Sequence, residues 1–430
     1  MAIGTPFHDR LVSLCHSYAW KEWAGYHVVR HFGPCHVAEY FAFRESTGII
    51  DVTPLFKHEV RGPDAAGVLS RIMVRDFGKM KPGTVAYTCW CDDRGKIVDD
   101  GTVTRLADDH FFVTAADATL NHFLRVSRGA RVAWEDVTHD IAALAVQGPT
   151  SRALLAACSD ADLDRLAFFG STPARLGGKE VRISRTGYTG DLGYEVWMNN
   201  ADALAVWDAL FDAGKDHGAV AAGLDALDVA RVEAGFIMLG VDYFSAPRVT
   251  IDARRSTPFE VGLDWTVKLD RPEPFVGKQA LLAEKASGAA WKLVGLEGDW
   301  DELCGLYERH GLPPALSTTV TRANIPLYKG GKFVGYTTSS VWSPILKQYV
   351  ALASVKAPFA EVGTRLAWEH TALYERQTIS ARVVEKPFFD PPRKKGAAEP
   401  ATGGRESGLA ATVPAAMAAS GAGAERGRGS

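Results

Sequence analysis

The chain has 430 residues, 47% of them hydrophobic and 23% charged, a composition typical of a globular protein with two or three domains. Its 48 Lys and Arg residues against 51 Asp and Glu residues give a net charge of −3, which leaves no basic excess for binding nucleic acid. The apolar run at 141–146 is far shorter than the ~18 residues of a spanning helix, and the N-terminal MAIGTPFHDR lacks the apolar core of a secretory signal. We therefore expect a cytoplasmic protein with neither nucleic-acid nor membrane partners.

The six cysteines are scattered along the chain, and only Cys89 and Cys91 are close together. A Cys-x-Cys pair on a strand places both side chains on one face, which could supply half of a metal site. No second Cys or His pair with zinc spacing stands nearby. We therefore expect free thiols in a reducing compartment, and no metal.

The first half of the chain mixes short strands and helices. Residues 58–61 alternate as in a strand, and Asp64 after a Gly-Pro turn is positioned to cap a helix that begins at residue 65. Residues 83–106 are typical of two strands joined by a hairpin at DDRG, and residues 110–114 predict a further strand.

Residues 141–149 predict a buried strand, and strands at 181–184 and 193–198 flank a glycine-rich turn. Asn200 is expected to cap a helix that ends at Gly214, and a second helix is expected over 225–234. The first of these two helices, after Asn200, presents four apolar side chains on one face: Leu204, Trp207, Leu210 and Phe211.

The C-terminal part has two different compositions. Residues 292–384 are rich in short strands and glycines and predict a small β-barrel, preceded by a charged connector after residue 281. Residues 394–430 contain no aromatic side chain and predict a disordered tail. The chain as a whole predicts an α+β fold with a C-terminal β-barrel.

Several phrases, in order over residues 20–390, resemble the tetrahydrofolate-dependent aminomethyltransferase family, which comprises the T-protein of the glycine cleavage system and related demethylases. They are IIDVTPLFKHEVRGPDA (49–65), AYTCWCDDRGKIVDDGTV (86–103), IAALAVQGP (141–149), SRTGYTGDLGYEVWM (184–198), GLDALDVARVEAGF (223–236), TPFEVGLDWTVKLD (257–270), FVGKQAL (275–281), GYTTSSVWSPIL (335–346) and VEKPF (384–388). The resemblance implies a three-domain cloverleaf around a central folate cavity. The domain limits that we expect are 1–56 with 142–255, then 57–141 carrying Asp100, then 256–390.

The glycine-rich segment 184–195 is the first candidate binding site. Its glycines permit close backbone approach to a flat ligand, Tyr188 offers a ring for stacking, and Glu195 is an acceptor pair for an aminopyrimidine edge. From the residues alone, an ordinary hairpin with a surface Tyr and Glu explains the pattern equally well. The resemblance implies that Tyr188 and Glu195 hold the pterin of tetrahydrofolate.

Asp99 and Asp100 are the candidate carboxylates. As neighbours on a strand they point to opposite faces, so we expect one to enter a pocket and the other to meet solvent, and not a paired-carboxylate mechanism. The resemblance implies that Asp100 is the catalytic acid beside the folate nitrogens, with Asp99 next to it in the site. It also implies that Tyr87, thirteen residues before Asp100, lies beside the folate.

Arg231 and Glu233, in VARVEAG, are expected on a helix near the site. A structural Arg–Glu pair and a role of Arg231 in binding the cofactor both remain open.

Two departures from the family pattern fall where the alkyl donor would bind. Pro54 and Leu55 stand in the place of the His-Met of DVSHM, and Leu227 replaces the arginine of GARD, which removes a bidentate cation. The folate half of the pocket therefore resembles the family and the donor half does not. This favours a small methylated donor over a lipoyl carrier protein, which stays possible. Six aromatic residues are candidates for the lining of a donor pocket: Trp20, Trp23, Tyr26, Phe56, Trp90 and Trp342.

The sequence thus predicts a tetrahydrofolate-dependent methyl or methylene transferase of the demethylase type. The alternatives are a glycine cleavage aminomethyltransferase, a folate-binding accessory protein without catalysis, and an enzyme or scaffold that has lost the cofactor.

Overall fold

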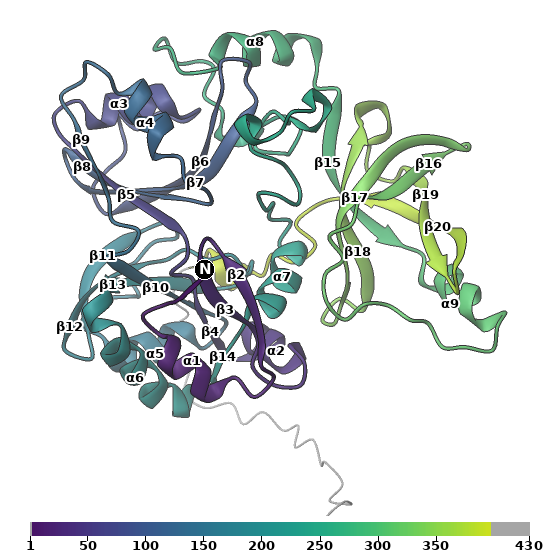
Figure 1. Cartoon of the computed structure of the whole chain (residues 1–430), viewed down its shortest axis with the longest axis horizontal. Helices are drawn as coiled ribbons and strands as arrows, with labels where there is room; N and C mark the ends of the chain where they lie inside the picture. The colour runs from purple at the N-terminus through teal and green to yellow at the C-terminus, as the bar shows by residue number, and fades with distance from the viewer. Residues whose placement is uncertain (1, 397–430) are drawn as a thin grey trace, which may run out of the picture. The chain divides into compact units, whose positions relative to one another are not determined.

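The computed structural model describes residues 2–396 of the chain. Within them, no helix is long and apolar enough to cross a membrane. The described residues form an α+β fold that ends in a closed β-barrel, as the sequence predicts (Figure 1).

The largest open sheet has six strands and brings together distant parts of the chain. Its strands in spatial order are β11 (Ser171–Leu176), β12 (Lys179–Ser184), β13 (Gly193–Asn199), β10 (Ile141–Gln147), β4 (Thr47–Asp51) and β14 (Ala219–Ala221). A smaller sheet precedes it in the chain, with the order β1 (Ile3–Gly4), β3 (Tyr26–His31) and β2 (Ala19–Trp23).

The central strand β10 is buried on both faces, which explains its unbroken apolar sequence. Ala142, Leu144 and Val146 pack into a cluster with helices α1 (His8–Leu14), α5 (Ser151–Cys158) and α6 (Ala203–Gly214). The alternate residues Ala143 and Ala145 belong to a second cluster, with α2 (Val37–Glu45) and α7 (Leu224–Glu233).

The second sheet contains the predicted hairpin. Its order is β6 (Thr84–Cys91), β7 (Ile97–Ala107), β8 (His110–Ala115), β5 (Phe56–Arg61) and β9 (Ala133–Asp136), and α3 (Ala65–Ile72) and α4 (Leu120–Val126) cover one face. The DDRG segment is the turn between β6 and β7, as predicted.

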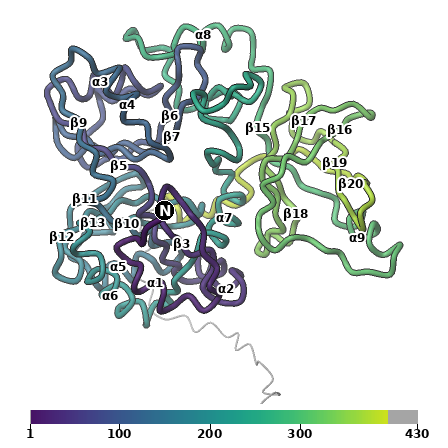
Figure 2. The backbone as a smooth tube through the Cα atoms, viewed as in Figure 1, coloured from purple at the N-terminus to yellow at the C-terminus, as the bar shows by residue number. Residues whose placement is uncertain are grey.

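The C-terminal barrel closes in the order β15 (Trp291–Gly298), β18 (Gln348–Lys356), β17 (Lys332–Ser343), β16 (Ile325–Lys329), β19 (Arg365–Ala372) and β20 (Glu375–Val384) (Figure 2). Closure leaves no unpaired sheet edge. Helix α9 (Trp300–Glu308) follows β15, and α8 (Lys278–Ser287) lies where the sequence predicts only a charged connector.

Two expectations about chain ends and caps need correction. The helix expected after Asn200 begins as a 3₁₀ turn at Asn200–Asp202, and Asn199 supplies the cap by accepting the N–H of Ala201. The tail expected from residue 394 does not hold for its first residues, because Lys394 is buried and closes a 3₁₀ turn at Pro392–Lys394. Residues 397–430 of that tail lie outside the described residues. The domain limits and the cloverleaf arrangement stay a prediction.

Candidate functional site

The carboxylate of Asp100 is held on both oxygens by phenol groups. Tyr87 donates to Oδ2 at 2.6 Å, and the phenol of Tyr243 donates to Oδ1. Asp100 pairs with Cys89 across the β6–β7 ladder, and Tyr87 lies two residues before Cys89, so Tyr87 and Asp100 share a face as diagonal neighbours. The thirteen-residue spacing in the sequence therefore reflects a direct contact.

Asp99 lies on the opposite face of β7, and the expectation that one carboxylate meets solvent is wrong. Asp99 is fully buried and accepts the backbone N–H groups of Asp100 at 2.8 Å and Asp117 at 2.9 Å. Asp100 is partly buried. Both faces of this sheet are covered by hydrophobic clusters, one containing Trp90 and the other containing Cys89, so Asp99 is removed from water and Asp100 partly so.

Burial therefore disfavours the ionised form of both carboxyl groups. It raises the pKa of Asp99 well above its usual range, and the adjacent charge of Asp100 adds to this. Burial also raises the pKa of Asp100, whereas its hydrogen bonds from Tyr243 and Tyr87 oppose that shift. Asp100 is thus a carboxyl group that can hold or release a proton above the usual carboxyl range.

Tyr188 lies on the glycine-rich segment between β12 and β13, and Glu195 lies on β13 itself. The phenol of Tyr188 donates to the carbonyl of Ile237, and its ring stacks on Phe236 with centroids 5.5 Å apart and planes at 27°. The Oε2 atom of Glu195 accepts from the hydroxyl of Thr186 at 2.7 Å. Burial raises the pKa of Glu195, whereas hydrogen bonds from the side chains of Thr186 and Ser184 oppose that shift.

The side chain of Gln147 explains two of the glycines in this segment. A Cβ atom at Gly187 or Gly193 would lie 1.9 or 2.2 Å from its Oε1 atom. Gln147 donates to the carbonyls of Thr186 and Tyr194, and thereby fixes both ends of the segment. The glycines serve packing within the protein, in addition to any approach of a ligand.

The structure brings Tyr87, Tyr188 and Asp100 into one neighbourhood. Burial raises the pKa of Tyr87, and the carboxylate of Asp100 and the phenol of Tyr188 both add to this shift. Burial likewise raises the pKa of Tyr188, on which the charges of Arg231 and Asp100 also act. Within the described residues, no hydrogen bond joins Glu195 to Tyr87, Tyr188 or Asp100, so its place in this neighbourhood rests on the phrase at 184–198, which contains both Glu195 and Tyr188.

Of the two alternatives left open for Arg231, the structural pair with Glu233 is wrong, since each residue has other partners. Arg231 is fully buried and bonds to Asp228 at 2.8 Å and Asp242 at 2.7 Å. Glu233 instead bonds to Arg44 at 2.6 Å. Residues two apart on α7 point in different directions, so they reach different neighbours.

The sequence did not single out two residues of the site. Tyr243 lies in the loop after α7, where no spacing links it to Asp100. Trp265 is 53% exposed and stacks on Tyr87 with centroids 6.0 Å apart and planes at 20°. An exposed Trp inside the phrase at 257–270 is the signal that could have indicated it.

An open groove of about 530 Å³ lies near Asp99. Two of the six candidate aromatic residues, Trp23 and Phe56, line it together with Leu239, Phe244 and Asp117. The N–H of Asp117 bonds to Asp99, which links the groove to the Asp99–Asp100 pair.

The other four candidate aromatics do not line the groove; Tyr26 and Trp90 are buried, and Trp20 and Trp342 are partly buried. Trp20 contacts His8, Tyr26 bonds to His139, Trp90 is fully buried beside Phe123, and Trp342 packs on Trp300.

Comparisons with known proteins agree with this architecture. Residues 8–271 match the family model of the GCVT N-terminal domain, and residues 309–390 match that of the glycine cleavage T-protein C-terminal barrel domain. The crystal structure of the glycine cleavage system aminomethyltransferase T from Bartonella henselae matches with a TM-score of 0.76 at 23% identity, over 91% of this chain and 99% of that chain. This likeness shows that the two proteins share a fold.

Two curated relatives carry different names. An aminomethyltransferase of Halothermothrix orenii is 34% identical over 356 residues, which cover 82% of this chain and 91% of that protein. A trimethylamine-oxide aldolase of Ruegeria pomeroyi is 34% identical over 409 residues, which cover 91% of this chain and 47% of the aldolase. The chain thus spans about half the length of that second relative. Both family models and these relatives show that the chain belongs to the glycine cleavage T-protein family of aminomethyltransferases.

Proposed function

We propose that the chain is a tetrahydrofolate-dependent one-carbon transferase that takes a methyl or methylene group from a small methylated donor. The observation that carries this proposal is the carboxylate of Asp100, which two phenols hold beside Tyr188. In this proposal Asp100 is the catalytic residue, and the enzyme works in the cytoplasm without nucleic-acid, membrane or metal partners.

The residues around Asp100 fit tetrahydrofolate. The rings of Tyr87 and Tyr188 can flank a pterin, and the carboxylate of Glu195, beside Thr186 and Ser184, can accept from an aminopyrimidine edge. Asp99 and Arg231 complete the set of proposed cofactor-binding residues. Both are fully buried and hydrogen-bonded within the protein, so we assign them to the shape and charge of the site.

Bound tetrahydrofolate would supply the nitrogen that accepts the one-carbon group. The protein would contribute proton transfer and the stabilisation of charge. Asp100, with its raised pKa, can accept or hold a proton at a folate nitrogen and can stabilise positive charge that develops on the donor. The hydrophobic clusters on both sides of β7 would limit the access of water to this exchange.

A small methylated donor is favoured by the residues that depart from the family pattern. Leu227 is buried on α7 in the same hydrophobic cluster as Val52, and Pro54 supplies no backbone N–H. This part of the site therefore lacks the fixed cation that Leu227 replaces. The name of the Ruegeria pomeroyi relative, trimethylamine-oxide aldolase, agrees with a methylated substrate.

A glycine cleavage aminomethyltransferase is the second candidate, because the Halothermothrix orenii relative carries that name. It would require a lipoyl carrier protein as partner. Incubation with candidate donors, followed by detection of methyl- or methylene-tetrahydrofolate, separates the two. Turnover only with an aminomethyl-lipoyl carrier would favour the second candidate.

Isothermal titration with tetrahydrofolate tests the proposal itself. We expect the wild type to bind, and Tyr188→Ala and Glu195→Ala to bind about 5- to 150-fold more weakly, since each loses a contact of ~1–3 kcal/mol. Tyr374→Ala and Glu180→Ala, at exposed positions, are the matched controls and should bind as the wild type does. No binding by the wild type would refute the proposal.

A further inference from the structure

The chain returns to the six-stranded sheet after the barrel closes. We call residues 385–396, which follow β20, the C-terminal strap. The N–H groups of Phe388 and Phe389 donate to the carbonyl of Glu233, at 2.9 and 3.0 Å, at the end of α7. The ring of Phe389 packs 4.3 Å from the guanidinium of Arg44, so the strap is also fixed to α2.

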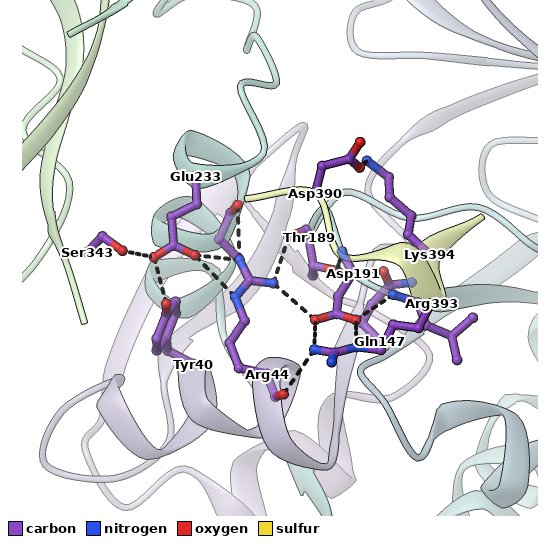
Figure 3. A network of polar contacts seen from close by, with 12 residues as sticks. Tyr40, Arg44, Gln147, Thr189, Asp191, Glu233, Ser343, Asp390, Arg393 and Lys394 are labelled. Carbon is purple, nitrogen blue, oxygen red and sulfur yellow. Dashed lines mark hydrogen bonds and ion pairs between the residues drawn. The ribbon is translucent and has the colours of Figure 1, made fainter. Parts of the chain in front are cut away.

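The strap binds the segment that carries Tyr188. We call residues 186–193 the Tyr188 loop. Arg393 donates through Nε and one terminal nitrogen to the two oxygens of Asp191, each at 2.7 Å (Figure 3). Asp191 is three residues from Tyr188, and its carboxylate is fully buried. A bidentate pair of this kind fixes orientation as well as distance.

A second arginine fastens the strap just before the loop begins. The guanidinium of Arg185 donates to the backbone carbonyls of Arg393, Lys394 and Gly396, at 3.4, 3.2 and 2.6 Å. The strap is therefore held from both sides of Tyr188, by Arg185 before it and Asp191 after it.

The charges around Asp191 balance only when Arg393 is present. Arg44 lies 2.6 Å from Glu233 and 3.7 Å from Asp191, and it also donates to the carbonyl of Thr189 in the loop (Figure 3). Two arginines thus face two buried carboxylates. Without Arg393, the guanidinium of Arg44 would be the one cation shared by the carboxylates of Asp191 and Glu233 within the described residues. Asp191 would keep its hydrogen bond from the N–H of Leu192. The fold should survive this loss, but the loop should loosen.

We propose that Arg393 is a positioning residue for tetrahydrofolate binding, which acts by fixing the Tyr188 loop through Asp191. This inference rests on the proposed function of Tyr188. Arg393 itself contacts no part of the proposed folate site. Its guanidinium bonds to Asp191 and to the carbonyl of Arg44, on the strap side of the loop.

Hydrogen exchange of the full chain tests the positioning without any ligand. In Arg393→Ala, amides of residues 186–193 should exchange at least about tenfold faster than in the wild type, because fewer contacts oppose local opening. Lys395→Ala, which removes an exposed pair with Asp390 in the same strap, should leave these amides unchanged. Unchanged exchange of the loop in Arg393→Ala would overturn the proposal.

Folate binding and turnover provide the second readout. If the competent loop conformation falls to about a tenth of the population, the Kd for tetrahydrofolate rises about tenfold, while kcat at saturating folate stays within about twofold. Arg393→Lys keeps the charge but loses the bidentate geometry, and should fall between the wild type and Arg393→Ala. Loss of kcat with an unchanged Kd would overturn the positioning role. If the wild type bound no folate, the proposed function would fail, and hydrogen exchange alone would decide whether Arg393 fixes the loop.

Discussion

The chemistry proposed for this protein depends on the environment of one carboxyl group. Asp100 accepts phenol hydrogen bonds on both oxygens, whereas Asp99 accepts two backbone N–H groups on the other face of β7. The two neighbouring residues therefore have separate roles. Asp100 faces the tyrosines of the proposed site, and Asp99 fixes the backbone from Asp100 to Asp117.

Asp100→Asn should abolish transfer but not binding. Loss of a general acid or base lowers the rate by about 100-fold or more, while the Kd for tetrahydrofolate should change by less than about tenfold. Asp99→Asn should instead lower the melting temperature and keep transfer, because an amide cannot accept both N–H groups equally well. Single-turnover rates and titration calorimetry on both variants check this. Loss of transfer in Asp99→Asn alone would show that the two faces are assigned wrongly.

Tyr243→Phe should move the pH dependence of transfer upward. Burial raises the pKa of Asp100 and the phenol hydrogen bonds oppose this, so removal of one phenol raises the pKa further. An active carboxylate loses activity as the pH falls through that pKa, so the acidic limb of kcat should shift to higher pH. One hydrogen bond to a charged group corresponds to a shift of about one pH unit.

The raised pKa of Asp100 affects stability in the opposite direction, because it favours the folded state at low pH. A carboxyl group with a raised pKa in the folded state stabilises the fold below its unfolded pKa, and that contribution is lost as the pH rises through the folded value. Tyr307→Phe, on α9, is a control that should leave the acidic limb of kcat at the same pH. If the acidic limb of kcat stayed at the same pH in Tyr243→Phe, the proposed role of Asp100 would be contradicted.

At the level of elements, the local patterns predicted seven of the fourteen described strands that precede the barrel, and the barrel only as a whole. The hairpin of β6 and β7 was predicted from DDRG, and β10 was predicted from its apolar run. The helix α8 was missed because Leu281 is its one fully buried residue, so its sequence has no clear apolar face. The cap at residue 199 was displaced by one position because a 3₁₀ turn precedes α6.

Contacts between distant segments could not be predicted from local patterns. Tyr243 bonds to Asp100 across 143 positions, and the strap residue Arg393 bonds to Asp191 across 202. The resemblance to a family indicated Asp100, Tyr87 and Tyr188, since these lie within quoted phrases. It could not show that Arg231 is saturated by Asp228 and Asp242, because that depends on the loop after α7.

The Tyr188 loop offers a test of its packing at Gly190. This residue has φ of +78°, and a Cβ there would lie 2.5 Å from the Cβ of Ala234. Gly178 has nearly the same φ, +79°, but no neighbour within 4 Å. Gly178→Ala should lower the free energy of unfolding by ~1–2 kcal/mol through strain alone, and Gly190→Ala by ~2–5 kcal/mol because overpacking adds to the strain. Urea unfolding of both variants measures the difference, and equal losses would show that the loop is not tightly packed against α7.

Across the whole molecule, polar groups buried on α7 and the loop after it connect the barrel to the rest of the described chain. Arg231 bonds to the hydroxyl of Ser339 on β17 at 2.7 Å, and that hydroxyl lies 3.1 Å from Asp242. Ser343, on the same strand, donates to Glu233 at 2.5 Å. The barrel is thus joined to the neighbourhood of Tyr188 by hydrogen bonds that contain two buried carboxylates.

This arrangement predicts that Arg231 contributes more to stability than to ligand contact. Arg231→Met would leave Asp228 and Asp242 without their shared cation. Asp228 keeps a second arginine, Arg322, at 2.8 Å, so Asp242 should bear most of the loss. Removal of one partner from a buried ion pair costs about 3–5 kcal/mol. The melting temperature should therefore fall by about 4–6 °C, even without folate.

Thermal unfolding of Arg231→Met and of Arg322→Met, without ligand, separates the two roles of Arg231. Arg322 is partly exposed, so its loss should lower the melting temperature by only about 1–2 °C. An Arg231 that acted only on folate would leave the melting temperature of the free protein unchanged and weaken binding alone. A large loss of stability with a smaller change in folate affinity would show that Arg231 joins the barrel to α7. The geometry of the proposed folate site would then depend on this contact between the barrel and α7.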